Sequence, residues 1–194
     1  MSRNQTEYED CITPFQVEAL GVRGSLVRLQ KTVQDLTRGN RYPNEVTILL
    51  ASTAALAGAL ACGIKYKGVF SLQVQGSGPV SLLLVDISSG GDLRGYAKFN
   101  GRALPKSDSS RSSVPRLLGT GYLAFTVDQG PDTNRYQGIT ELSGATLADC
   151  AQTYFRDSEQ LETAVVLDSK FDEDSTLRAG AFMLQKMPHP PVNP

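Results

Sequence analysis

The sequence predicts an α+β fold, a layered β-α-β sandwich with helices packed between antiparallel β-sheets. Three observations lead to this prediction: strand-like segments that recur along most of the chain, one long helix that is apolar on every side, and one amphipathic helix. A helix without a polar face cannot be covered by a single sheet. We therefore expect the apolar helix to lie between layers.

The first half of the chain predicts one strand and two helices. Residues 22–29 predict the strand, and residues 31–38 a short helix that ends at Gly39 and Asn40. Pro43 suits the first turn of the next helix, which runs to about Cys62. Residues 46–64 are uncharged and long enough to cross a membrane. Most of them are small residues that gain little in lipid, so we expect a buried core helix.

The middle of the chain predicts an antiparallel meander. Phe70, Leu72 and Val74 alternate with polar residues, which is the period-2 pattern of a strand with one buried face. Residues 80–87 and 93–99 repeat the pattern after short breaks. The break at residues 76–79 (GSGP) predicts a turn. The alternative, a phosphate-binding loop, is disfavoured because no third glycine follows at the required spacing and the next element is a strand.

The second half predicts a loop, a hairpin, a helix and two final strands. The serine-rich residues 106–116 predict the loop, and residues 121–127 and 135–142 the hairpin. Residues 146–155 carry an apolar stripe at helical spacing, with Thr146 and Asp149 as an N-cap pair and Cys150 facing inward. Residues 163–169 and 176–186 predict the last strands. The tail PHPPVNP is typical of polyproline-like chain.

Composition bounds the class of protein. With 19 basic and 20 acidic residues, the net charge is −1, and there is no evident basic stripe for a nucleic-acid backbone. Residues 1–10 are polar and acidic, unlike a signal peptide, so we expect a cytoplasmic protein. Cys11, Cys62 and Cys150 are odd in number and far apart, which predicts reduced, unpaired thiols. Neither nucleic acid nor membrane is expected as a partner.

The sequence does not predict an enzyme. Its only histidine, His189, lies in the proline-rich tail, where no base can be held near a nucleophile. Cys62 and Cys150 fit small buried hydrophobes, and we expect no basic group next to Cys11 that would lower its pKa. The carboxylates at residues 7–10 and 172–174 fit solvated charge better than metal ligation. We expect no catalytic residue, metal ligand or cofactor.

Seven short segments, in this order and spacing, resemble the N-terminal domain of the heat-shock protein 33 family. They are VRGSLV at 22–27, LQVQGSGP at 72–79, LRGYA at 93–97, GTGY at 119–122, RYQG at 135–138, YFRDSEQL at 154–161 and AGAFMLQKMP at 179–188. The resemblance implies a redox-regulated, ATP-independent holdase chaperone with helices between two β-layers. It divides the chain into a loose segment at 1–14, a client-binding domain at 15–188 and a tail at 189–194.

Members of that family continue into a helical linker and a zinc module with four cysteines, as C-x-C and C-x-x-C. Neither motif occurs in this sequence, and its three cysteines do not correspond to those ligands. We therefore carry over neither zinc nor a redox switch. We hypothesise that the surface which the linker covers in the family stays open here. The resemblance also implies unfolded or partly folded proteins as partners, and a chain that can form a homodimer.

Client binding needs exposed apolar area rather than catalytic groups. Some candidates lie on strands whose two faces are both partly apolar, and others at outward-facing positions of their strands. They are Leu83, Val85, Tyr96, Tyr122, Phe182 and Leu184. The alternative is that a second layer of helix or sheet covers these side chains, which is commoner than an exposed patch. Two further alternatives stay open for the chain: an inert structural core without client binding, and a small-ligand enzyme that uses the turn at residues 76–79.

Overall fold

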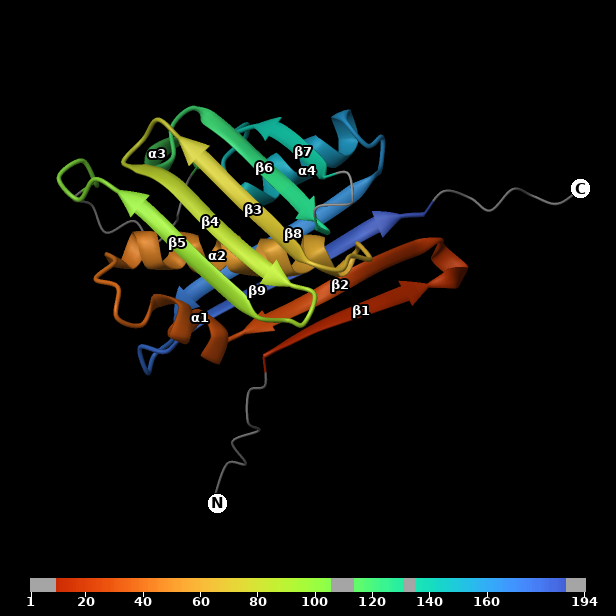
Figure 1. Ribbon diagram of the computed structural model, residues 1–194, viewed down its shortest axis with the longest axis horizontal. Helices are drawn as coiled ribbons and strands as arrows, with labels where there is room; N and C mark the ends of the chain where they lie inside the picture. The colour runs from red at the N-terminus through yellow and green to blue at the C-terminus, as the bar shows by residue number, and fades with distance from the viewer. Residues whose placement is uncertain (1–9, 106–113, 131–134, 188–194) are drawn as a thin grey trace, which may run out of the picture.

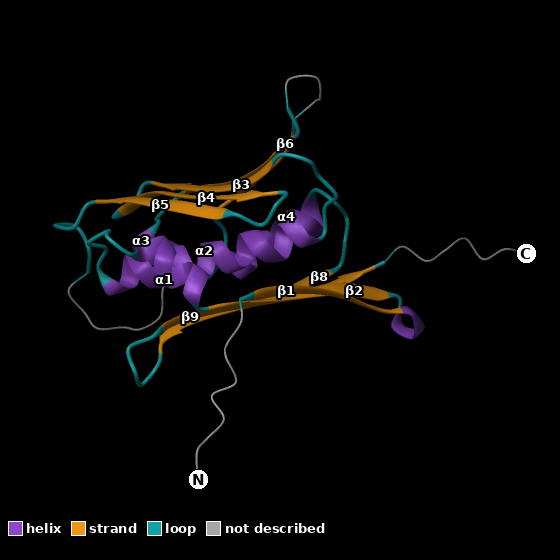
Figure 2. Cartoon of the chain, turned by 60° about the horizontal axis from the view of Figure 1, so that its bottom comes forward, coloured by secondary structure: helices purple, strands orange, loops and turns teal. Residues whose placement is uncertain are grey.

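The computed structural model describes residues 10–105, 114–130 and 135–187. They form two antiparallel sheets with the main helices between them (Figures 1 and 2). The four-stranded sheet has the order β1-β2-β9-β8, and the five-stranded sheet the order β5-β4-β3-β6-β7. The expected layered α+β sandwich is confirmed.

The strands of the four-stranded sheet come from both ends of the chain. They are β1 (Cys11–Val17), β2 (Val22–Leu29), β8 (Thr163–Phe171) and β9 (Leu177–Lys186), with a 3₁₀ turn, η1 (Glu18–Leu20), between β1 and β2. The five-stranded sheet is formed by β3 (Val69–Gly76), β4 (Val80–Ser88), β5 (Leu93–Phe99), β6 (Gly121–Asp128) and β7 (Tyr136–Glu141). The predicted meander is β3, β4 and β5, and the predicted hairpin is β6 and β7.

The helices are α1 (Lys31–Thr37), α2 (Asn44–Cys62), α3 (Val114–Leu117) and α4 (Leu147–Asp157). Helix α4 begins with the predicted cap: the Thr146 hydroxyl accepts a hydrogen bond from the Asp149 amide, and the Asp149 carboxylate accepts one from the Thr146 amide. The short helix α3 was not predicted: it includes residues 114–116, which were expected to form the end of the loop. The remainder of that predicted loop, residues 106–113, lies outside the described residues, as does the tail after Met187.

Helix α2 is the centre of the core and is buried on all sides. It is long and apolar enough to cross a membrane by length and composition, yet 78% of its most apolar window is buried inside the protein. Gly58 lets the four-stranded sheet approach it closely. A Cβ added to Gly58 would lie 3.2 Å from Ile12 Cδ1 and 3.4 Å from Val27 Cγ1, both in the four-stranded sheet. The apolarity of α2 is thus accounted for by packing between layers.

Helix α2 and the four-stranded sheet are also joined by hydrogen bonds. The Ser25 hydroxyl of β2 donates to the carbonyl of Ala59 at 3.3 Å, and the Ser169 hydroxyl of β8 donates to the carbonyl of Ile48 at 3.1 Å. The hydroxyls of Ser52 and Ser169 also contact each other. These bonds satisfy polar groups that would otherwise be costly to bury.

The N-terminal boundary differs from the prediction. The segment expected to be loose up to residue 14 includes the start of β1, which pairs with β2 over its whole length from Cys11 to Val17. Asp10 holds this segment to the rest of the fold. Its carboxylate accepts hydrogen bonds from the amides of Gln30 at 2.5 Å, Lys31 at 3.1 Å and Thr32 at 2.5 Å.

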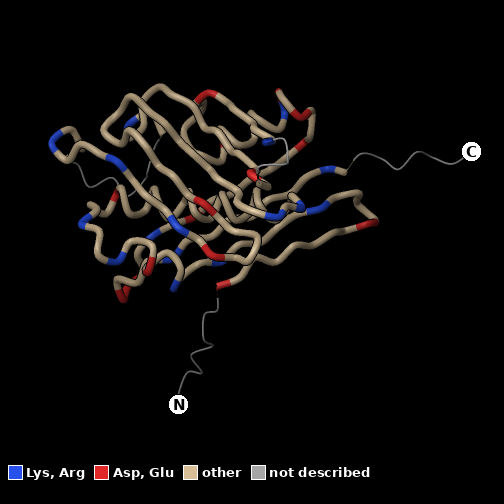
Figure 3. The backbone as a smooth tube through the Cα atoms, in the orientation of Figure 1, with Lys and Arg blue, Asp and Glu red and all other residues tan. Residues whose placement is uncertain are grey.

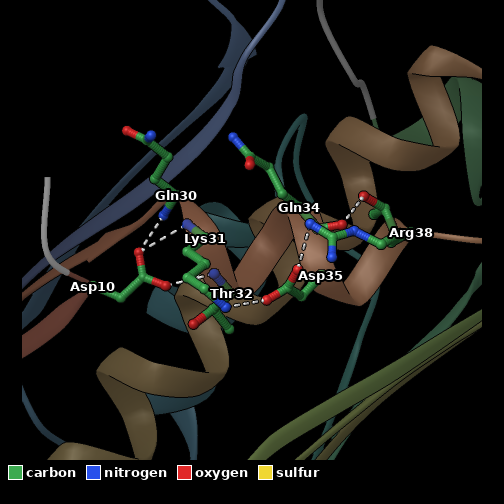
Figure 4. A network of polar contacts seen from close by, with 8 residues as sticks. Asp10, Gln30, Lys31, Thr32, Gln34, Asp35 and Arg38 are labelled. Carbon is green, nitrogen blue, oxygen red and sulfur yellow. Dashed lines mark hydrogen bonds and ion pairs between the residues drawn. The ribbon is translucent and has the colours of Figure 1, made fainter.

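Asp10 faces the start of α1, and Lys31, Asp35 and Arg38 form ion pairs farther along that helix (Figure 4). Burial by itself would raise the pKa of Asp10. The hydrogen bonds from Thr32, and those from the amides that the carboxylate caps, hold its pKa below the ordinary value of 3.8.

We predict that Asp10→Ala lowers the free energy of unfolding by about 1 kcal/mol at pH 7, as for a lost helix cap. Because the folded-state pKa is depressed, the carboxylate stabilises the fold above the unfolded pKa and stops doing so as pH falls through the folded pKa. Urea unfolding of both proteins at pH 7 and pH 3 measures this. The gap between them should narrow at pH 3, and an undiminished gap would contradict the assignment. Asp35→Ala, which removes only exposed ion pairs, is the control with a smaller loss.

Candidate functional site

The outer face of the four-stranded sheet carries a row of exposed apolar side chains. The strand register places Leu26 of β2 opposite Phe182 of β9, and Phe182 opposite Val166 of β8. Their exposed fractions are 40%, 39% and 63%. Single exposed apolar residues are common, but a contiguous row of three large ones on one sheet face is not. This row is therefore the centre of a candidate binding surface.

The neighbouring row extends this surface. Gly24 of β2 lies opposite Phe15 of β1 and Leu184 of β9, and Leu184 lies opposite Ala164 of β8. Phe15 and Leu184 are half-buried, whereas Ala164 is exposed. We call the apolar side chains of the two rows the outer apolar face: Phe15, Leu26, Ala164, Val166, Phe182 and Leu184. No described helix or strand covers this side of the sheet (Figure 2).

Gly24 lets Phe15 lie flat across the sheet. The ring centroids of Phe15 and Phe182 are 5.6 Å apart and their planes differ by 15°, which is a stacked pair. A Cβ at position 24 would lie 2.5 Å from Phe15 Cζ and 2.3 Å from the carbonyl oxygen of Met183. Any larger residue at position 24 would displace the ring, so the smooth shape of this part of the face depends on glycine.

Charged residues border the outer apolar face. On β8, Asp168 and Lys170 alternate with inward-facing residues and lie on the same side of the strand as Val166. At the other end of the face, Lys186 and Glu162 form an exposed ion pair at 3.0 Å. An apolar centre with a charged rim is the usual anatomy of a protein-binding surface.

The outer face of the five-stranded sheet is different in character. Its central strand β3 presents Ser71, Gln73 and Gln75, and the neighbouring Tyr122 hydroxyl donates a hydrogen bond to Gln75 Oε1. Asp86 of β4 lies opposite Ser71 and is paired with Arg94 at 2.8 Å. The glutamines of β3 separate Leu84 and Tyr96 on one side from Tyr122 and Ile139 on the other, so the apolar area of this face is interrupted along its central strand.

Two of the candidate client-binding residues are wrong. Leu83 and Val85 have no exposed surface, because they lie on the inner side of β4 against the core. Residues 82–85 are all apolar, so alternation could not show which of them face the core. Asp86 could have shown it, because a charged residue favours the outer face of a sheet. Leu82 and Leu84 share the face of Asp86, so Leu83 and Val85 face inward.

The other four candidates are at least partly exposed, but they lie on opposite sides of the molecule. Tyr96 and Tyr122 are 51% and 37% exposed and lie on the outer face of the five-stranded sheet. Phe182 and Leu184 lie on the outer apolar face. The predicted outward phases of the two tyrosines are therefore confirmed, but the six residues do not form one site.

Sequence reasoning missed the partners of Phe182 on the outer apolar face. Leu26 and Val166 come from strands far away in the sequence, and only the register across β2, β9 and β8 brings them together. Period-2 alternation indicates which residues of one strand share a face. It does not show which strands are neighbours, so the outer apolar face could not be predicted from the sequence.

The turn at residues 76–79 packs against the segment before β6, and two of its amides donate hydrogen bonds to that segment. The amide of Ser77 donates to the carbonyl of Thr120 at 2.8 Å, and the amide of Gly78 to the carbonyl of Leu118 at 2.7 Å. A Cβ at Gly76 would lie 2.2 Å from the same Leu118 oxygen. Because these two amides already bind carbonyl oxygens, they are not available to hold a phosphate. The glycines serve close packing against the segment before β6.

The three cysteines have different surroundings. Burial raises the pKa of Cys62 and of Cys150, and the Cys150 thiol also donates to the carbonyl of Ser143 at 3.1 Å. Cys11 contradicts the expectation of no basic neighbour, because the guanidinium of Arg28, directly across the strand pair, donates to its sulfur at 3.2 and 3.3 Å. All three are free thiols.

Clusters of ionisable groups are few among residues 10–105, 114–130 and 135–187. No group of three or more His, Cys, Asp or Glu residues is arranged to hold a metal ion there. Tyr136, Tyr154 and Glu159 form one hydrogen-bonded cluster, with both hydroxyls donating to the same carboxylate oxygen. Burial and the carboxylate raise the pKa of Tyr154, and the two hydroxyls lower the pKa of Glu159. These shifts favour the neutral phenol and the charged carboxylate.

A two-sheet sandwich whose most unusual surface is an exposed apolar sheet face has the features of a protein-binding domain. Comparison with known proteins agrees. The chain matches the family described as Hsp33 protein over residues 10–192, and it belongs to that family. It is 38% identical over 182 residues to a 33 kDa chaperonin of Caulobacter vibrioides, with 91% of this chain and 60% of the relative aligned. It is 33% identical to a 33 kDa chaperonin of Photorhabdus laumondii, over 93% of this chain and 60% of that protein.

The fold is similar to a solved structure from the same family. The crystal structure of the 33 kDa chaperonin (Hsp33 homologue) of Thermotoga maritima superposes with a TM-score of 0.79 at 24% identity, covering 91% of this chain and 60% of that one. The chain thus spans about 60% of the length of these relatives.

Leu83 and Leu84 give a matched test of the two faces of β4. We predict that Leu83→Ala lowers the free energy of unfolding by about 2–5 kcal/mol, because it empties a fully buried site. Leu84→Ala, on the half-buried outer side, should cost clearly less. Chemical denaturation of both variants measures the difference, and equal losses would show that the face assignment of β4 is wrong.

The cysteine environments predict an order of alkylation by iodoacetamide near neutral pH. Cys150 should react slowest, because it is fully buried and its raised pKa keeps the thiol protonated. Cys62, half-buried with a raised pKa, should react faster than Cys150 but more slowly than Cys11 on the edge strand. Peptide mass spectrometry at successive times gives the order. In urea the three should converge, and early labelling of Cys150 in the folded protein would contradict this packing.

Proposed function

We propose that this chain is the client-binding domain of an ATP-independent holdase chaperone, and that the outer apolar face is the surface which captures unfolding proteins. The single observation that carries the proposal is the contiguous row of Leu26, Phe182 and Val166, exposed on the one face of the four-stranded sheet that no described element covers. Membership of the Hsp33 family and the name chaperonin of its relatives support the same class of function.

The physical basis of capture is removal of apolar area from water. At about 25 cal/mol per Å², covering roughly 400 Å² of apolar surface would contribute about 10 kcal/mol. Association costs about 4–15 kcal/mol in lost freedom, so individual contacts are weak and reversible. Because the hydrophobic effect is non-directional, many different apolar segments fit the same face. These are the properties that a holdase requires.

Capture by the face is favoured over pairing with the edge of the sheet. β1 is an edge strand, and an unfolded chain could in principle add to it as a further strand. Pro14 lies in the middle of β1 and has no amide hydrogen to donate. A regular ladder along this edge would be interrupted there, whereas the outer apolar face is continuous.

The proposed mechanism requires no metal, nucleotide or other cofactor, and no oxidant. The outer apolar face is exposed among the described residues as they stand, so no oxidation is needed to open it in this polypeptide. The 194-residue chain should therefore bind clients in reducing buffer.

Unfolded and partly folded proteins are the proposed partners, and the cytoplasm is the proposed location. Basic and acidic residues are interspersed along the backbone rather than gathered into a stripe (Figure 3), which supports the expectation that nucleic acid is not a partner. The expectations of a homodimer and of no membrane partner stay predictions.

Val166 and Ile139 offer a matched test. Both are exposed, at 63% and 55%, β-branched and on edge strands, but Val166 belongs to the outer apolar face and Ile139 to the opposite sheet. We predict that Val166→Asp raises several-fold the ratio of chaperone to client needed to suppress light scattering by a heat-unfolding client. Ile139→Asp should leave that ratio unchanged.

The assay is run with dithiothreitol and with peroxide. Suppression in both conditions is expected, and a requirement for peroxide would contradict oxidant-independent binding. No suppression under either condition would favour the inert structural core. If both substitutions impair suppression equally, the outer apolar face is not the binding surface.

A further inference from the structure

A recess lies between the layers, at the C-terminal end of α2. A pocket of about 330 Å³ opens between α4, the end of α2 and the inner side of the four-stranded sheet. Its walls are mainly apolar, and its polar groups come from three places: Arg23 of β2, Gln185 of β9, and the cluster of Tyr136, Tyr154 and Glu159. A mainly apolar recess with a few convergent polar groups is the usual form of a ligand site.

The aromatic wall of the pocket is held in place before any ligand arrives. The rings of Phe125 and Tyr154 meet edge to face at 4.8 Å, and those of Tyr154 and Phe155 at 5.4 Å. Gly138 allows this packing, because a Cβ there would lie 2.4 Å from Phe125 Cζ. A fixed wall of this kind accepts a large apolar group without the cost of ordering side chains.

Glu159 supplies an acceptor at the pocket. Its Oε1 atom takes hydrogen bonds from the hydroxyls of Tyr136 and Tyr154. Its other oxygen, Oε2, accepts no bond from any residue in the described part of the chain. The two tyrosines fix the carboxylate in orientation and leave one oxygen available for an N–H group.

Arg23 supplies a donor at the same pocket. Its Nη2 atom donates to Gln185 Oε1 at 3.1 Å, and Gln185 Nε2 donates in turn to the Thr163 hydroxyl at 3.2 Å. Gln185 is 3% exposed, so it is a fixed anchor for the exposed guanidinium. Arg23 forms no ion pair with any described residue, and its remaining N–H groups are available for a carbonyl oxygen.

The two charges together select the chemistry of the occupant. A free cation would be attracted by Glu159 but repelled by Arg23. A free anion would be attracted by Arg23 but repelled by Glu159. A neutral peptide unit offers one N–H and one C=O, and so complements both. The mainly apolar volume of the pocket suits a large side chain on that peptide.

We propose that this pocket binds a single aromatic or large aliphatic side chain of an extended polypeptide segment, with Glu159 accepting from its main-chain N–H and Arg23 donating to its carbonyl. The inference deepens the proposed function, because it gives client segments a second, side-chain-selective site apart from the outer apolar face. The occupant is a stretch of unfolded protein, identified by a peptide unit that carries an apolar side chain.

Blocked nonapeptides of serine, glycine and threonine, with either phenylalanine or alanine at the centre, are the probes. The chain has no tryptophan, so Phe155→Trp adds a single fluorescent reporter to the pocket wall. We expect a saturable change with the phenylalanine peptide, and binding roughly tenfold or more weaker with the alanine peptide, as for the loss of a buried aromatic side chain. Calorimetry on the unmodified chain repeats the comparison in case the reporter disturbs folding.

Three variants locate the peptide. Leu161→Phe, which narrows the pocket, and Glu159→Gln should each weaken binding of the phenylalanine peptide several-fold, whereas Val166→Asp on the outer apolar face should not. Tetramethylammonium or hexanoate that binds this pocket more tightly than the peptide would overturn the assignment. So would equal affinity for the two peptides.

The outcomes separate this inference from the proposed function. If Val166→Asp alone abolishes peptide binding and client protection together, the pocket assignment is wrong and the outer apolar face stands. If the pocket variants lose the peptide while Val166→Asp leaves client protection intact, the pocket assignment stands and the proposed capture surface is wrong.

Discussion

The structure depends on one constraint: α2 has no polar side. A helix of this kind must exclude water around its whole circumference, and a twisted sheet can cover only one side of it. Two sheets are therefore required, one on each side (Figure 2). The alanines and Gly58 of α2 keep the layers close, and the serine hydroxyls of β2 and β8 donate hydrogen bonds to carbonyls of the helix. Helix α4 lies in the same middle layer as α2 and contacts both β7 and β8.

Covering one helix with two sheets uses only the inner face of each sheet, and the outer faces are then free to differ. On the five-stranded sheet, β3 presents serine and glutamines, and Asp86 with Arg94 adds a charged pair. On the four-stranded sheet, the outward positions of β2, β8 and β9 include Leu26, Val166 and Phe182. The core is complete without these three side chains, and each keeps between 39% and 63% of its surface exposed. Their exposure is therefore more readily explained by binding than by stability.

The sequence was sufficient for features that depend on local pattern. The apolar circumference of α2, the cap at Thr146 and the alternation in β3 each reside in one contiguous segment, and each was predicted correctly. Features that depend on pairing between distant segments could not be predicted from the sequence. β1 has only weak alternation and contains Pro14, so its place in the sheet comes from its pairing with β2 and from Asp10 at the start of α1. The outer apolar face needs strands that are more than 130 residues apart in the chain.

An exposed apolar face is also a hazard, because copies of the same protein can associate through it. The net charge of −1 gives almost no general repulsion between molecules, so protection must be local. Asp168 and Lys170 beside Val166, and the Lys186–Glu162 pair at the far end, place charges at the rim of the face. Two rigid, flat copies cannot meet there without desolvating those charges. A flexible unfolded segment is narrower than the face and can cover its apolar centre while the rim stays in water. The same rim that limits self-association would therefore favour unfolded over folded partners.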